Sequence, residues 1–183
     1  MIHNGNLKII DFGNCLRIPY SDPMNENCIT DVSEGTIRKL IKSQGQGGNH
    51  SWRYIAPEIV QKQPFDGFAI DLWSAAIILY VMLLGAFPFQ SARRVDVLYY
   101  KFAVEGKLEE TMKEHDISIS KEACDLLQNL LWENPMKRLT LLQIMEHPWV
   151  SNQSTTKEEC NNPIRHRSYY KFKWYRALKM YHQ

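Results

Sequence analysis

Residues 70–89 read IDLWSAAIILYVMLLGAFPF, a long apolar stretch that decides the fold. The run predicts a helix over Ile70–Leu84 that ends at Gly85, because glycine commonly follows the last helical residue. Extended back to Ala69 the stretch covers 21 residues, which is about the length needed to cross a bilayer. Asp71 near one end, Gly85 near the other and the lack of a basic flank favour a buried core helix instead. We therefore expect no transmembrane segment.

Shorter helical segments surround this stretch. Ala56-Pro57-Glu58 predicts a short helix with proline in its first turn. Ser120–Trp132 begins with a capping serine and carries leucines at helical spacing, and Thr140 caps a further helix that His147-Pro148 should stop. A weaker helical pattern covers Val95–Val104, a strand pattern covers Leu7–Ile10, and the polar stretch from about Asp22 to Asn49 reads as a loop. The predicted fold class is mainly α, with a short N-terminal strand.

The amino-acid composition of the chain limits the classes of function that it can have. The 183 residues are 44% hydrophobic and 23% charged, as in a globular domain with a sizeable core. Residues 1–150 carry 15 basic and 18 acidic side chains, so they show no nucleic-acid footprint. The four cysteines are scattered without a C-x-x-C pair, and the first 20 residues contain no apolar leader. These features predict a reducing compartment, the cytoplasm or the nucleus.

Short motifs follow one another in a recognisable order. Residues 6–13, NLKIIDFG, contain Asp11-Phe12-Gly13 after the strand pattern. The later blocks are Tyr54-Ile55-Ala56-Pro57-Glu58, Asp71-Leu72-Trp73-Ser74, Gly85-Ala86-Phe87-Pro88-Phe89, Asn134-Pro135-Met136-Lys137-Arg138-Leu139-Thr140 and His147-Pro148-Trp149. A lone Asp-Phe-Gly would be weak evidence, but the ordered set resembles the C-terminal lobe of a eukaryotic-type Ser/Thr protein kinase. The nearest group is the calcium/calmodulin-dependent-kinase-like one, and the resemblance covers about residues 5–150.

The resemblance implies roles for individual residues. Asp11 matches the aspartate that holds Mg²⁺ on ATP, and Phe12 and Gly13 complete that cofactor-binding loop. Residues 11–58 match the activation segment, which is longer than usual because residues 23–48 resemble an insertion. Its end matches the substrate-facing loop formed by Ser51, Tyr54, Ala56, Pro57 and Glu58. The usual phosphorylated position falls near Gly47, which has no hydroxyl, so Ser43 is the candidate phosphosite, with an ordinary solvated serine as the alternative.

Three further matched residues have structural roles in the family. Glu58 and Arg138 resemble a buried ion pair that ties the activation segment to the lower helices. Asp71 matches an acid that hydrogen-bonds the backbone of the catalytic loop, with the amides at the helix N-terminus as the alternative partners. Trp73 belongs to the same block. None of these residues transfers a proton.

Several kinase motifs are not found among the 183 residues. They are the Gly-rich loop, the lysine of the third strand, its glutamate partner and the H-R-D-x-x-x-x-N catalytic loop. We expect the catalytic base upstream of Met1, and this polypeptide alone to be inactive and to bind ATP weakly. Residues 1–150 are then a partial, truncated kinase domain whose parent transfers the ATP γ-phosphate to protein Ser/Thr. The alternative is a non-catalytic, pseudokinase-like binding module.

Residues 151–183 form a separate basic tail with seven Lys/Arg and two acids. If Ser168–Tyr181 is helical, one face carries an aromatic and apolar set and the rest is basic: Tyr170, Trp174, Ala177, Leu178 and Tyr181, against Lys171, Lys173, Arg176 and Lys179. This pattern is similar to calmodulin-binding or autoinhibitory segments of the group, so residues 165–183 predict binding to calmodulin or an acidic surface. The alternatives are a helix docked on the lobe and a disordered tail.

Overall fold

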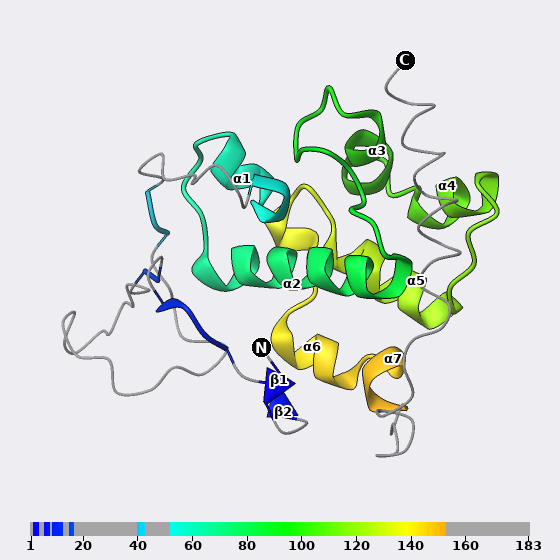
Figure 1. The fold of residues 1–183 in the computed structure, drawn as a ribbon. Helices are drawn as coiled ribbons and strands as arrows, with labels where there is room; N and C mark the ends of the chain where they lie inside the picture. The colour runs from blue at the N-terminus through cyan, green and yellow to red at the C-terminus, as the bar shows by residue number, and fades with distance from the viewer. Residues whose placement is uncertain are drawn as a thin grey trace.

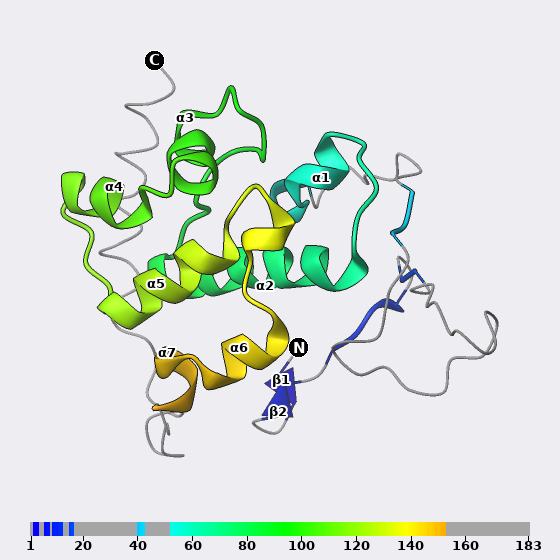
Figure 2. The ribbon, with the colours of Figure 1, turned by 180° about the vertical axis from the view of Figure 1, so that it is seen from behind.

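A computed structural model describes residues 2–3, 6–7, 9–12, 15–16, 40–42 and 52–152. These residues form a largely helical unit, with α2 through its centre, α1 and α3 on one side of it and α6 and α7 on the other (Figures 1 and 2). The helices are α1 (Pro57–Val60), α2 (Gly67–Leu84), α3 (Val97–Tyr99), α4 (Leu108–Glu114), α5 (Lys121–Leu130), α6 (Leu141–Glu146) and α7 (Pro148–Ser151). The mainly helical prediction agrees with this architecture.

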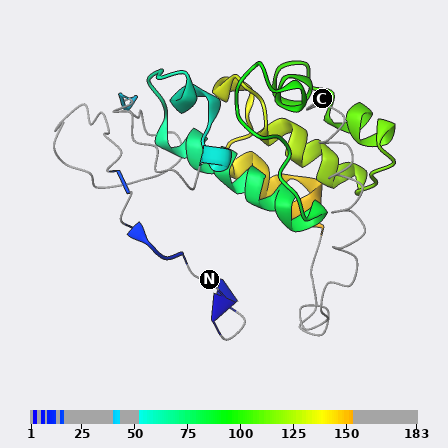
Figure 3. The same cartoon turned by 45° about the horizontal axis from the view of Figure 1, so that its top comes forward.

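The described N-terminal residues form a small hairpin away from the helical unit (Figure 3). Its strands β1 (Ile2–His3) and β2 (Asn6–Leu7) pair antiparallel, with Ile2 opposite Leu7. The strand expected over Leu7–Ile10 is confirmed at Leu7 and is wrong at Ile9 and Ile10, which are not in a strand and are 83% and 56% exposed. A strand persists only where a neighbour accepts its backbone hydrogen bonds, and such a neighbour is a matter of tertiary structure.

The central helix α2 begins three residues before the expected start. Asp66 caps it by accepting a hydrogen bond from the Phe68 N–H at 3.1 Å. The helix ends as expected at Gly85, whose φ of 72° is left-handed and whose N–H donates to the Val81 carbonyl at 2.8 Å. By length and mean hydropathy (2.0) alone α2 qualifies as a membrane span. In the fold, its Trp73, Ile77, Tyr80 and Leu84 are fully buried among the other helices, as in a core helix.

The core lies where α2 packs against α5 and the segment around α3. Trp73, Phe89 and Tyr99 form an aromatic cluster with ring centroids 5.4–6.3 Å apart. The α5 helix contributes Leu126, Leu127 and Leu130, all buried. Ser120 caps this helix by accepting from the Ala123 N–H at 3.1 Å, as its sequence indicates. Helix α5 nevertheless ends at Leu130, two residues before the expected Trp132.

Two other helical expectations are refined. Helix α6 has the Thr140 cap, reinforced by Gln143 in a capping box, and it ends at Glu146. His147 is extended there (φ −62°, ψ 136°), as favoured for a residue before proline, and its ring caps the new helix α7 by accepting from the Trp149 N–H. The expected helix at Val95–Val104 divides into α3 and a π-helical turn at Tyr100–Val104.

Helix α4 has no counterpart in the sequence analysis. No side chain of its own N-terminus caps it. Instead Gln128 of α5 accepts from the Leu108 N–H at 3.1 Å and donates to the Phe102 carbonyl at 2.9 Å. The cap is therefore supplied by a residue 20 positions away, which no local pattern reveals.

The expected loop at 22–49 is described only at residues 40–42. There Ile41 and Phe65 form an isolated antiparallel bridge through two backbone hydrogen bonds of 2.8 and 3.0 Å. Phe65 is buried, so this bridge attaches the segment to the start of α2. The remainder of the expected 23–48 insertion lies outside the described residues.

Candidate functional site

The structure brings Glu58 and Arg138 together across 80 positions of sequence. Glu58 lies in the first turn of α1, and Arg138 follows a short 3-10 turn at Pro135–Lys137. The guanidinium donates from Nη1 to Glu58 Oε1 and from Nη2 to Glu58 Oε2, both at 2.8 Å. Glu58 is 3% and Arg138 6% exposed, so a bidentate ion pair is enclosed in the protein.

Arg138 also fills its remaining hydrogen-bonding capacity. Its other donors reach three backbone carbonyls, those of Trp132 at 2.9 Å, Ala69 at 3.0 Å and Glu133 at 3.2 Å. The guanidinium lies 4.8 Å from the centre of the Trp73 ring. One side chain thus joins α1, the first turn of α2 and the segment after α5, and all five N–H groups of the guanidinium are used. The resemblance gave the Glu58 partner, but the carbonyl contacts were not foreseen.

The chain before α1 forms a 3-10 turn at Trp52–Tyr54 that rests on the segment after α2. The Tyr54 and Phe87 rings meet edge to face, with centroids 5.2 Å apart. The Tyr54 carbonyl accepts from Ser74 Oγ at 3.0 Å, which fastens the turn to α2. Ala56 and Pro57 are buried just beyond it. Tyr54, Ala56, Pro57, Glu58, Trp73 and Arg138 therefore form one connected region.

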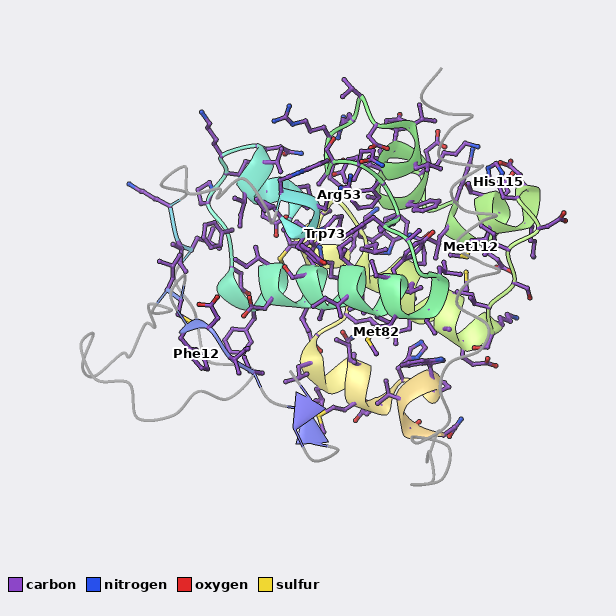
Figure 4. All side chains as sticks on the ribbon, in the orientation of Figure 1. Phe12, Arg53, Trp73, Met82, Met112 and His115 are labelled. Carbon is purple, nitrogen blue, oxygen red and sulfur yellow. The ribbon has the colours of Figure 1, made fainter. Side chains whose placement is uncertain are left out.

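Arg53 is a residue that sequence reasoning missed in this region. Its guanidinium lies 5.1 Å from the centre of the Trp52 ring and 5.0 Å from that of Phe87, and it donates to Gln90 Oε1 at 2.8 Å (Figure 4). These contacts orient the half-buried cation beside the 3-10 turn. The alternation of aromatic and basic residues in Trp52-Arg53-Tyr54 was the available signal.

Asp96 is a second missed residue, and it organises the segment that supports Tyr54. This buried carboxylate accepts from the N–H groups of Gln90 at 2.8 Å and Ser91 at 3.1 Å. It also caps α3 by accepting from the Leu98 and Tyr99 N–H groups at 3.1 and 3.2 Å. Aspartate is a favoured helix cap, but the expected helix at Val95–Val104 placed Asp96 inside the helix and not at its cap. No sequence signal indicated that the same carboxylate would also accept hydrogen bonds from the backbone N–H groups of Gln90 and Ser91.

Asp11 and Phe12, the described residues of the Asp-Phe-Gly motif, lie apart from this connected region. Asp11 has a φ of 63° and is exposed, and Phe12 is 67% exposed. Figure 4 shows Phe12 away from Arg53 and Trp73. Gly13, Ser43 and Ser51 lie outside the described residues, as does the tail from 153 onward. Among the described residues no group of three His, Cys, Asp or Glu side chains is placed to hold a metal. Asp11 therefore fits a magnesium site only as one ligand, with others supplied by phosphates and water.

Asp71 does not occupy the helix mouth, so the alternative role as a partner of the N-terminal amides is wrong. Asp66 takes that role, and Asp71 lies in the second turn of α2. Although its side chain reaches solvent, the surrounding protein removes part of the carboxylate's hydration and raises its pKa above 3.8. Within the described part of the chain Asp71 has no hydrogen-bond partner, and the catalytic-loop contact implied by the resemblance involves residues that this sequence does not contain.

The raised pKa of Asp71 predicts a pH-dependent stability. A carboxyl whose pKa is higher in the folded than in the unfolded state destabilises the fold when ionised, and this penalty fades as the pH falls through its folded pKa. We expect Asp71→Asn to unfold at a higher urea concentration than the natural chain at pH 7. The difference should vanish below pH 3.8, the ordinary pKa of the group. Urea titrations from pH 3 to pH 7 measure this, and an advantage that is independent of pH would contradict it.

A cavity of about 560 Å³ opens elsewhere, between α4 and α5. Its lining includes Met112, Ile117, Lys121 and Cys124, and none of the expected site residues. Burial raises the pKa of the Cys124 thiol to about 11, so this cysteine is an unreactive thiol at neutral pH. The region around Glu58 and Arg138 is therefore the candidate site.

Comparison with known proteins agrees with this geometry. Residues 35–150 match the family model described as protein kinase domain. The chain is 30% identical to the serine/threonine-protein kinase SRK2G of Arabidopsis thaliana over 151 residues, which covers 76% of this chain and 42% of that kinase. It is 41% identical to CBL-interacting protein kinase 1 of rice over 103 residues, covering 56% of this chain and 21% of that kinase.

A third relative is the calcium/calmodulin-dependent protein kinase type II subunit delta of Oryctolagus cuniculus. It is 30% identical over 150 residues, which is 75% of this chain and 27% of that protein. The chain thus spans about two fifths or less of the length of these relatives. The family model covers more than half of the chain, and it includes Tyr54, Glu58, Asp71 and Arg138. The chain therefore belongs to the protein kinase domain family.

Proposed function

We propose that residues 1–150 are the lower, substrate-facing lobe of a Ser/Thr protein kinase of the calcium/calmodulin-dependent-kinase-like group. The whole kinase transfers the γ-phosphate of ATP to serine or threonine of protein substrates. The observation that carries the proposal is the enclosed Glu58–Arg138 pair with its three carbonyl contacts. It anchors the end of the 11–58 activation segment to α2 and α5, which a kinase needs to present a substrate loop in one position.

The residues of this chain have distinct tasks in that function. Asp11 would hold Mg²⁺, which neutralises phosphate oxygens when ATP is bound, and Phe12 and Gly13 would shape the same loop. Ser51 and the 3-10 turn at Trp52–Tyr54 would face the protein substrate. The Phe87 ring and the Ser74 hydroxyl hold Tyr54 in its position. Arg138 holds α1 through its ion pair with Glu58. In this proposal the kinase acts in the cytoplasm or nucleus, and residues 165–183 bind calmodulin or an acidic surface.

A chimaeric enzyme tests the proposal. Residues 1–152 are fused behind the N-terminal part of a Ser/Thr kinase such as SRK2G, chosen so that it ends just after an H-R-D-x-x-x-x-N motif, which the 183 residues lack. We expect the fusion to phosphorylate serine and threonine peptides in the presence of Mg²⁺ and ATP. Asp11→Asn should lower its rate by on the order of 10³-fold or more, because the metal loses its carboxylate. Transfer of ³²P to peptide measures the rate.

Asp116→Asn is the matched control, because it removes an exposed aspartate with the same positive φ far from the motifs. We expect it to leave the rate unchanged. A folded chimaera that transfers no phosphate, while SRK2G itself does, would contradict the kinase proposal and favour the non-catalytic binding module. Equal losses for Asp11→Asn and Asp116→Asn would contradict the role of Asp11.

A further inference from the structure

Arg53 is held in place by contacts that leave most of its hydrogen-bonding groups unused. Its Nη2 donates to Gln90 Oε1 at 2.8 Å, and its guanidinium lies 5.1 and 5.0 Å from the centres of the Trp52 and Phe87 rings. A guanidinium has five N–H groups. Within the described part of the chain only one of them has an acceptor, and this acceptor is a neutral amide. The charge of Arg53 therefore has no carboxylate partner among the described residues.

Two other arginines of this region differ from Arg53 in their partners. Arg138 uses all its N–H groups and neutralises the buried Glu58. Arg94 forms a bidentate pair with Glu133. Arg53 is half-buried and has lost part of its hydration, but no protein carboxylate in the described residues replaces that water. A ligand with a carboxylate would supply the missing partner.

The place of Arg53 in the fold indicates where such a ligand would come from. Arg53 directly follows Trp52, which is 41% exposed, and it lies on the side of α2 where α1 lies (Figures 1 and 4). Both residues belong to the 3-10 turn at Trp52–Tyr54, which the contacts of Tyr54 hold against α2. In the function proposed above this turn faces the protein substrate, and the inference rests on that function.

The charges of the turn that supplies Gln90 also favour an acidic ligand. This turn carries Arg93 and Arg94, whose side chains are both exposed. Its buried acid, Asp96, already accepts four backbone hydrogen bonds. Glu133, which borders a hollow with both arginines, accepts from Arg94 and from a glutamine amide at 2.9 Å. The acids of this turn and hollow are thus engaged, and the excess charge there is positive.

We propose that Arg53 is a specificity-determining residue that binds the carboxylate of an aspartate or glutamate near the phosphorylated serine or threonine of the protein substrate. The planar guanidinium can donate two parallel hydrogen bonds to one carboxylate. The aromatic rings and Gln90 already restrict the side chain, so that binding costs less conformational entropy than it would for a freely rotating arginine. The substrate class of this site is therefore acidic peptide sequences.

Peptide binding to the full 183-residue chain tests the proposal without requiring phosphoryl transfer. The probes are fluorescein-labelled alanine peptides with a central serine and a single glutamate at each flanking position in turn, and each is compared with its glutamine counterpart. Fluorescence anisotropy at low ionic strength gives the dissociation constants. We expect at least one position at which glutamate binds about fivefold or more tightly than glutamine, because charge-assisted hydrogen bonds replace neutral ones.

Arg53→Gln should abolish this preference for glutamate. Arg53→Lys should keep only part of it, because the ammonium group keeps the charge but lacks the planar fork. Arg93→Gln is the matched control, since it removes the same charge from an exposed arginine of the neighbouring turn, and it should leave the preference unchanged. Urea unfolding of each variant shows that it is folded, and if Arg53→Gln does not fold, the comparison with Arg53→Lys decides.

The proposal is overturned if no flanking position distinguishes glutamate from glutamine, or if folded Arg53→Gln or Arg53→Lys keeps the full preference. Equal losses for Arg53→Gln and Arg93→Gln overturn it as well, because the preference then comes from the general positive charge of the surface. A preference for phosphoserine without one for glutamate also overturns it, because the occupant is then a phosphate. The expected preference together with an inactive chimaera would contradict the kinase function and support acidic-peptide binding at Arg53.

Discussion

Replacing Arg138 with methionine should lower the free energy of unfolding by about 3–5 kcal/mol, because Glu58 would keep its buried charge without a partner. The pair is enclosed, with the two side chains 1% and 3% exposed, and the carbonyls of Ala69, Trp132 and Glu133 would lose their donors as well. Methionine keeps much of the length of arginine, so the loss reports on the charge and hydrogen bonds. Urea unfolding followed by circular dichroism measures it.

The chain offers a matched control in Arg94 and Glu133. This is also a bidentate arginine–glutamate pair, with contacts of 3.0 and 3.1 Å, but the Arg94 side chain is 67% exposed. Solvent screens such a pair, so Arg94→Met should change the stability little. The double variant Glu58→Leu with Arg138→Met should recover part of the loss, because no unpaired charge remains. Similar losses for Arg94→Met and Arg138→Met would contradict the importance of burial.

Leu127→Ala should cost about 2–5 kcal/mol of unfolding free energy, because it removes buried methyl groups and leaves a cavity. Leu127 is fully buried where α5 packs on α2, within the cluster that contains Tyr80 and Ile77. Leu40→Ala is the control of identical chemistry at a site 61% exposed, and it should change stability by less than about 0.5 kcal/mol. Differential scanning calorimetry of both variants tests this. Equal effects would mean that α5 does not form the core with α2.

Local signals predicted the helix boundaries best. Gly85 ends α2, Ser120 begins α5 and Thr140 begins α6, because caps and left-handed residues act within one turn of the chain. Of the two failures, one has a local cause and the other a tertiary cause. The start of α2 was missed because Asp66 precedes Gly67, which is a poor helix former, and α4 was missed because its cap is Gln128 of another helix.

The candidate site was predicted unevenly. The motif order identified Glu58 and Arg138, but no spacing rule predicts contact between residues 80 positions apart. That pairing came from the resemblance. Arg53 had a local sequence signal and Asp96 is a favoured capping residue, but nothing in a single sequence indicates their distant partners, the Phe87 ring and Gln90 side chain for Arg53 and the Gln90 N–H for Asp96. The same holds for the hydrogen bond from Ser74 to the Tyr54 carbonyl. The roles of Asp11, Ser43 and Ser51 stay predictions.

The sequence by itself determined the helical class, the caps of α5 and α6 and the family, because each depends on residues close together in the chain or on motifs in order. Tertiary structure alone decided which side of α2 is enclosed and which is open. The apolar residues of α2 face every direction, so its periodicity selects no buried side. The buried side is selected by tertiary packing, in which α5 and the rings of Phe89 and Tyr99 enclose the side of α2 that carries Trp73, Ile77 and Tyr80. The described residues leave Ala75, Ile78 and Met82 exposed.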